Sequence, residues 1–249
     1  DENIQLTSIN QSIQFQRGQL RWEWAPVDGV ESTFMAAAGV NLTEVNAGTV
    51  GIGANEFTTN VREDLRLQLS KRLLLNVGAD FQFRANDLEA SIPGFGDPDP
   101  NDGANPAPDG LEDAFNISVS YPAVYAELQA EVVEGLKLLP GVRVDHYGTV
   151  GRTVVSPRLA TRWDLDEKWT AKGGSGLFTQ PPSEFQTVPV RGGNPDLEAE
   201  KAIHYAVGGE WRPRKHLEVD TTLFYRDSYD LVSSAAPTPQ DAMGDPILV

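Results

Sequence analysis

Oxygen-bearing side chains are concentrated in one stretch of this sequence, GFGDPDPNDGANPAPDGLED, residues 94–113. Asp97, Asp99 and Asn101 alternate there, a spacing that could bring carboxylate and amide oxygens around a calcium ion. An EF-hand loop would also have a glycine at its sixth position and a glutamate at its twelfth, and both are missing here. A solvated acidic surface loop is therefore the favoured interpretation, and a calcium site is the alternative.

Residues capable of covalent chemistry are present but badly placed for it. Asp145, His146 and Ser156 are close in sequence, yet adjacent residues of a strand point to opposite faces, so no catalytic triad is predicted. The remaining histidines, His204 and His216, belong to other segments, and a shared metal site is not expected. We predict a protein that is not an enzyme and that needs no cofactor.

Composition narrows the class of partner. The formal net charge is −16, and nucleic acid is excluded as a partner because phosphate binding needs clustered Lys and Arg. Much of the acidity is local, since residues 86–116 hold eight Asp or Glu and no Lys or Arg. This segment is also rich in Pro, Gly and Asn, which indicates a loop. There is no cysteine, so neither a disulfide nor a thiolate metal site is available.

The elements that must position these residues are strands. From 217 to 226 the odd positions are mainly apolar and the even positions mainly polar, a period of two that is typical of a β-strand. The same alternation recurs, and short connectors make neighbouring strands antiparallel. Ten segments show the pattern: 12–25, 30–43, 56–69, 72–86, 116–132, 136–147, 154–165, 168–179, 201–212 and 216–232.

Connector length and tryptophan placement suggest which solvent surrounds the strands. Short turns alternate with the long connectors 87–115 and 180–200 and the medium ones 44–55 and 148–153, so the two kinds of end lie on opposite sides. We take the glycines of 48–53 as marking a mobile loop. All five tryptophans lie near short turns, which favours an aromatic girdle at a membrane interface: Trp22, Trp24, Trp163, Trp169 and Trp211.

Strand length also favours a membrane barrel over a soluble sheet. The segments run to about ten residues or more, longer than the usual five or six of a globular sheet. We therefore predict an all-β, antiparallel up-and-down transmembrane barrel whose apolar face meets lipid and whose polar face lines a wet lumen. The charged lumen residues are expected to pair with one another or with a plug: Arg143, Arg158, Arg162, Asp145, Asp164 and Glu210.

The second half of the chain resembles a known family, the TonB-dependent outer-membrane receptors, in their C-terminal barrel. The resemblance depends on the order and spacing of several degenerate motifs over about a hundred residues. They are Gly141-Val142-Arg143-Val144-Asp145, a Ser-Pro-Arg-Leu strand start at 156–159, a Phe-x-x-Pro strand end at 178–182, Asn-Pro-x-Leu-x-x-Glu at 194–200, and Tyr225 to Leu231.

The resemblance implies a barrel of about 22 strands in the bacterial outer membrane, holding an N-terminal plug that contacts the TonB complex. Such a receptor takes up a large nutrient, most often a ferric siderophore. No plug, TonB box or terminal aromatic strand is visible, so residues 1–249 are expected to be a single partial barrel domain of about ten strands from which the plug and the C-terminal strands are missing.

The position of the long loops, at the extracellular mouth of such a barrel, predicts the ligand-binding residues. They are Phe95, Asp97, Asp99, Asn101, Asp102, Phe185, Gln186, Arg191 and Asn194. Two other functions stay open from the sequence alone. A passive outer-membrane porin would lack the plug, and a soluble all-β carbohydrate-binding or adhesion module would cover its apolar faces with protein.

Overall fold

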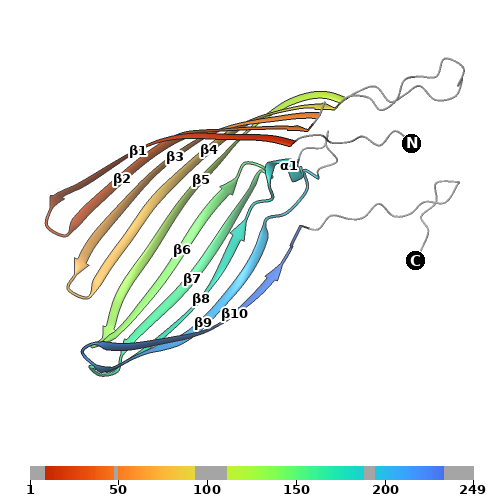
Figure 1. Ribbon diagram of the computed structural model, residues 1–249. Coiled ribbons are helices and arrows are strands. Elements are labelled where there is room, and N and C mark those ends of the chain that lie inside the picture. Colours follow the sequence, from red (N-terminus) through yellow and green to blue (C-terminus); the bar gives the residue numbers. More distant parts are fainter. Residues whose placement is uncertain (1–8, 48–49, 93–110, 188–193, 233–249) are drawn as a thin grey trace, which may run out of the picture.

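The strand pattern of the sequence folds into one continuous antiparallel sheet (Figure 1). In this computed structural model, the residues described are 9–47, 50–92, 111–187 and 194–232. The sheet has ten strands, and their spatial order is their order in the chain, so every strand pairs with its sequence neighbours. The prediction of an all-β, up-and-down architecture of about ten strands is confirmed.

The strands run almost the whole length of the described chain, and the helical content is one short turn. Their bounds are β1 (Ile9–Val27), β2 (Val30–Ala47), β3 (Val50–Ser70), β4 (Leu73–Ile92), β5 (Leu111–Val133), β6 (Leu136–Tyr147), β7 (Arg152–Asp164), β8 (Trp169–Gln180), β9 (Glu200–Arg214) and β10 (Leu217–Tyr229). Helix α1 (Glu184–Thr187) lies between β8 and β9. No helix in the described ranges has the length and apolarity needed to cross a membrane.

Several strands are longer than their sequence pattern predicts. The expectation of a medium loop at 44–55 is wrong, because β2 and β3 continue through it with Ala47 paired to Val50. Gly51 and Gly53, assigned to a mobile loop, lie within β3 and pair with β4 at Ser91 and Glu89. The alternation continues here, but Val45, Ala47, Val50 and Ile52 lie on the inner face, opposite to the apolar face of the rest of the strands. With glycines at 51 and 53 between them, the segment resembles a loop in sequence. The connector 148–153 is also shorter, since β7 begins at Arg152.

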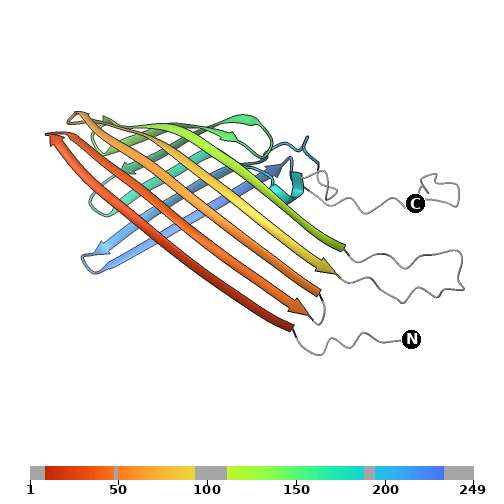
Figure 2. The same cartoon turned by 90° about the horizontal axis from the view of Figure 1, so that it is seen from above.

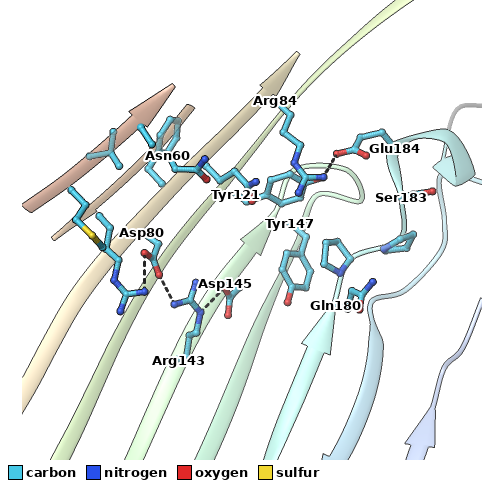
Figure 3. Close-up of a pocket in the computed structure, with 18 of the residues that line it drawn as sticks. Asn60, Asp80, Arg84, Tyr121, Arg143, Asp145, Tyr147, Gln180, Ser183 and Glu184 are labelled. Atoms are coloured by element: carbon cyan, nitrogen blue, oxygen red, sulfur yellow. Dashed lines mark hydrogen bonds and ion pairs between the residues drawn. The ribbon is translucent and has the colours of Figure 1, made fainter. Parts of the chain in front are cut away.

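The two faces of the sheet differ in polarity as predicted. Paired residues of neighbouring antiparallel strands point to the same face. Arg62 pairs with Asp80 and Tyr125 with Arg143, which defines the inner face, the side on which α1 lies (Figure 3). Leu65 pairs with Val77 on the opposite, outer face.

The sheet is twisted and curved but not closed (Figure 2). Within the described residues β1 and β10 are its two edges, and they are not hydrogen-bonded to each other. An open sheet of this kind is the geometry expected for part of a larger barrel, since a complete barrel has no free edge.

One carboxylate on the outer face departs from the alternation. Glu63 interrupts an apolar row on β3 that includes Leu67, Leu65 and Val61. Its Oε1 accepts a hydrogen bond of 2.5 Å from the hydroxyl of Ser32 on β2. The sequence shows Glu63 as an exception to the alternation. Its hydrogen-bond donor, Ser32, can be identified only once β2 and β3 are paired.

Candidate functional site

An alternating chain of ion pairs crosses the inner face from β3 to β6. Arg62 pairs with Asp64 at 2.7 Å and with Asp80 on β4 at 3.6 Å. Arg143 on β6 pairs with the other Asp80 oxygen at 2.5 Å and with Asp145 at 2.9 Å. Asp80 therefore joins two arginines from strands that are not neighbours in the sheet. Fixed opposite charges of this kind keep both guanidinium groups oriented.

Tyr125 on β5 fills the space between these arginines. Its hydroxyl accepts a hydrogen bond of 2.8 Å from Arg62, and the guanidinium carbons of Arg62 and Arg143 lie 5.2 and 5.8 Å from its ring centroid. The ring crosses Gly78, its cross-strand partner, where a Cβ atom would come within 2.3 Å of the tyrosine oxygen. Glycine at this position is required by that close approach.

A second network lies on β7, β8, β9 and β10. The two guanidinium nitrogens of Arg162 donate to the two carboxylate oxygens of Glu210 at 2.9 and 3.0 Å, a bidentate geometry. Lys172 bonds Glu210 at 3.1 Å and also contacts Asp220. Arg162 further pairs with Asp164 at 3.2 Å. Glu210, whose side chain is only 9% exposed, thus joins β7, β8 and β9, and Lys172 extends the network to β10.

These networks test the predicted pairing of inner-face charges. The pairs Arg143 with Asp145, Arg162 with Asp164 and Arg162 with Glu210 are confirmed. Arg158, expected to pair within the same set or with a plug, binds Glu127 on β5 at 3.1 Å. The two residues lie on either side of Gly141 of β6, so their contact depends on the register of three strands.

The connector between β8 and β9 folds back onto the inner wall. Glu184, the first residue of α1, accepts a hydrogen bond of 2.8 Å from the phenol of Tyr121 on β5 and lies 3.5 Å from Arg84 on β4 (Figure 3). The turn is capped locally, because the backbone N–H of Ser183 donates to the Gln186 side chain at 2.8 Å. The Glu184 side chain is 8% exposed, so this connector is held against the sheet rather than extended into solvent.

A pocket of about 700 Å³ opens between this connector and the inner wall (Figure 3). Arg84, Tyr121, Tyr147 and Glu184 line it together with Gln180 and the two prolines that follow. The Tyr121 and Tyr147 rings meet edge to face with centroids 6.4 Å apart. Phenol and guanidinium groups donate hydrogen bonds, so the pocket suits a polar, electron-rich ligand with aromatic or apolar parts.

The described part of the chain shows no candidate metal site. Among those residues no group of three or more His, Cys, Asp or Glu is close enough to hold a metal ion. The acids of the inner face lie next to arginine or lysine partners instead, as in the pairs of Asp80, Asp145 and Glu210. These paired charges of the inner face are suited to binding a polar ligand.

Only part of the predicted ligand-binding set falls on described residues. Gln186 and Asn194 come together across the β8–β9 connector, because the Asn194 N–H donates to the Gln186 backbone oxygen at 2.8 Å. Phe185 lies within α1, between Glu184 and Gln186. The other members lie outside the described residues: Phe95, Asp97, Asp99, Asn101, Asp102 and Arg191. The calcium alternative falls there too.

Four pocket residues were missed by sequence reasoning, which looked for a site in the loops. Arg84, Tyr121 and Tyr147 belong to strands, and their inner-face parity was readable from the alternation. Glu184 was adjacent to the predicted Phe185, and no local signal distinguished its role. A strand alternation shows which side a residue faces, but it does not show which loop folds back over it.

The predicted tryptophan girdle has exposed members at the short-turn end. Relative exposure ranges from 40% at Trp211 to 65% at Trp22. Trp169 pairs with Trp211 in the sheet, and their rings stack with centroids 5.5 Å apart. The remaining two, Trp24 and Trp163, lie within a few residues of the β1–β2 and β7–β8 turns.

Comparison with known proteins agrees with this architecture. The sequence model of the family described as "TonB dependent receptor-like, beta-barrel" matches residues 3–245. The iron-regulated outer membrane virulence protein of Vibrio cholerae is 29% identical over 130 residues, which cover 49% of this chain and 20% of that protein. This chain therefore spans about a fifth of the length of that relative.

Solved structures share the fold. The ferric enterobactin receptor of Pseudomonas aeruginosa superposes with a TM-score of 0.66 at 21% identity, over 88% of this chain and 35% of that one. A siderophore receptor of Acinetobacter baumannii gives a TM-score of 0.68 at 14% identity, over the same 88% and 35%. At these identities the likeness concerns the fold, and the described sheet corresponds to about a third of each barrel protein.

Proposed function

This chain belongs to the TonB-dependent receptor family, and we propose that it forms part of the wall of a receptor that imports a large nutrient of the ferric siderophore class. The chain is a bacterial outer-membrane protein with a partial transmembrane β-barrel fold. The observation that carries the proposal is the pocket closed by Glu184, where a long connector is held over the inner wall.

The fold assigns an environment to each face under this proposal. The outer face, with Leu65, Val77 and Leu223, contacts the hydrocarbon of the membrane. The inner face, with its two ion-pair networks, lines the lumen and faces a plug domain through which the TonB complex acts. Charges in a wet lumen cost little, whereas the same charges facing lipid would cost about 2–4 kcal/mol for Arg or Lys at mid-depth.

Residues 1–249 are proposed to be one partial barrel domain, completed by further strands to about 22. The two free edges, β1 and β10, support this reading, because an unpaired strand edge is not stable in hydrocarbon. The five tryptophans near the short turns are proposed as the interface girdle at that end of the barrel.

The chemistry of the pocket supports a siderophore more than a small nutrient. A volume of about 700 Å³ is in the range that holds a drug-sized molecule. Arg84 is 38% exposed on its side chain and reaches Glu184 at only 3.5 Å, so its guanidinium remains accessible to an anionic ligand. Tyr121 and Tyr147 offer aromatic surface beside it. The relatives named for iron or ferric siderophores are consistent with this class.

Growth on defined iron sources tests the proposal. A strain lacking the receptor is complemented with the wild-type gene or with Arg84→Ala and Tyr147→Phe variants, and uptake of a panel of ferric siderophores is measured. We expect one class of siderophore to depend on the receptor and on energised TonB, with reduced uptake in the variants. Uptake that continues without TonB would select the passive porin, and no dependence on any iron source would contradict the siderophore.

The acidic loop has its own test. Deleting residues 96–110 is expected to spare folding and to weaken ligand uptake, because the proposal puts this segment at the extracellular mouth. Unchanged uptake would remove the loop, with Asp97, Asp99 and Asn101, from the binding site. Calcium-dependent uptake that is lost in the same deletion would instead support the calcium alternative.

A further inference from the structure

Basic side chains gather at the short-turn end of the last strands. Lys168 lies in the connector between β7 and β8, Arg214 ends β9, and Lys215 and His216 form the turn between β9 and β10. In sequence these basic residues contrast with the acidic segment 86–116, and the net charge of the chain is −16. A cluster of cations in so acidic a protein indicates an anionic partner.

The two turns lie side by side. The N–H of Arg212 donates to the backbone oxygen of Lys168 at 2.8 Å, and the strands continue from there as the stacked pair Trp169 and Trp211. Lys168 is itself fixed, because Asp166 accepts hydrogen bonds from the backbone N–H groups of Lys168 and Trp169 at 2.7 and 2.8 Å.

A register shift brings one cation to the outer face. Val219 pairs with Trp211, but Leu217 pairs with Arg214, so β9 contains one residue more than β10 in this interval. This bulge reverses the alternation in β9, and Arg214 shares the outer face with Leu217, just beyond the tryptophan pair. Without the bulge, the alternation would have left Arg214 on the inner side with Arg212.

Cations outnumber acids around a hollow at these turns. A depression of about 600 Å³ is lined by Lys168, Arg212, Arg214, Lys215 and His216, together with Glu167 and Glu218. Glu218, which also lines it, already accepts a hydrogen bond of 2.9 Å from Arg212. Lys168, Arg214 and Lys215 make no ion pair with an acid in the described ranges of the chain.

We propose that this hollow binds the phosphate headgroup of an anionic glycerophospholipid in the leaflet next to the short turns. The guanidinium of Arg214 and the ammonium groups of Lys168 and Lys215 contact the phosphate oxygens. The acyl chains follow the outer face along Leu217 and the stacked tryptophans, whose rings suit the headgroup level. This continuity between cations and apolar surface selects a lipid over free phosphate, which would use the cations alone.

Native mass spectrometry of the full-length receptor in detergent tests the site with dioleoyl phosphatidylglycerol as the probe and dioleoyl phosphatidylcholine as the neutral comparison. The test variant is the double substitution Arg214→Gln with Lys215→Gln. The matched control, Lys71→Gln with Arg72→Gln, removes the same charge from the β3–β4 turn, which has no tryptophan pair beside it. Heat-modifiable migration on gels checks that each variant is folded.

Wild type and control are expected to retain one phosphatidylglycerol more tightly than phosphatidylcholine, by about tenfold or more. Each basic residue near an anionic lipid surface contributes about a fivefold change in affinity, so the double variant should lose most of that preference. Equal binding of the two lipids by wild type, or an equal loss in the control, would overturn the site. Displacement of the lipid by millimolar inorganic phosphate would show a phosphate site without lipid selectivity and would also overturn it.

Discussion

The phenol of Tyr121 donates a hydrogen bond of 2.8 Å to the carboxylate of Glu184, and this contact joins residues 63 positions apart. Tyr121 belongs to the sheet, whereas Glu184 begins the turn of helix in the β8–β9 connector. Arg84 approaches the same carboxylate from β4 at 3.5 Å. The connector is therefore positioned by the wall, and the pocket exists because of that contact.

Removing the charge of Glu184 should release the connector. In Glu184→Gln the hydrogen bond from Tyr121 becomes neutral and the pairing with Arg84 is lost, a cost of about 1–3 kcal/mol for a mostly buried group. Hydrogen exchange of the backbone N–H groups at 183–187 is expected to accelerate by one to two orders of magnitude. Glu198→Gln is the control, since Glu198 pairs with Lys201 at 3.3 Å with its side chain 60% exposed. Equal acceleration in both variants would mean that Glu184 does not anchor the connector.

A methyl group at Gly78 should displace Tyr125. The Cβ of Gly78→Ala would lie 2.3 Å from the tyrosine oxygen and 2.6 Å from the backbone oxygen of Glu63. Overpacking of this kind costs about 1–3 kcal/mol, and it also breaks the hydrogen bond from Arg62 to the phenol. The measurement is the urea midpoint for folding into vesicles, with Gly53→Ala as control because a Cβ there meets nothing closer than 4.0 Å. If Gly78→Ala behaved like the control, the ring could not lie over Gly78.

The faces of β10 predict a contrast in membrane assembly. Leu223→Arg is expected to block insertion of the full-length protein, because arginine at mid-depth on the lipid side costs about 2–4 kcal/mol. Asp220→Asn is expected to insert normally, because Asp220 contacts Lys172 on the inner face. Leu223 is 71% exposed on the other face. Assembly in vesicles, followed by heat-modifiable migration, gives the comparison, and equal behaviour of the two variants would contradict the register of this strand.

Glu63 should reduce the stability of the barrel. Replacing this outward carboxyl by leucine extends the apolar row of β3, so Glu63→Leu is expected to stabilise the protein in bilayers by about 1–2 kcal/mol. Ser32→Ala should act in the opposite direction, because it leaves the Glu63 oxygen without its hydrogen bond. Both are measured as shifts of the denaturant midpoint in vesicles. Destabilisation by Glu63→Leu would indicate that the carboxyl has a partner in the assembled protein.

The period-two alternation determined most of what is local in this fold. It assigned Leu223 and Asp220 to opposite faces, predicted ten antiparallel strands, and placed the tryptophans beside the short turns. It failed at 44–55, where the apolar residues change to the inner face, glycines lie between them, and pairing nevertheless continues. Alternation is a property of single side chains and of the solvent each face meets, so it can be read from sequence.

The pocket and the bulge at Arg214 depended on three-dimensional placement. Glu184 meets Tyr121 because a connector returns across the sheet, and Arg214 reaches the outer face because β9 holds one residue more than its partner strand in that interval. Neither the path of a loop nor the position of a bulge can be read from the local sequence of polar and apolar residues. Contacts between distant segments depend on how the whole sheet curves and pairs, and that information is absent from any short stretch of the chain.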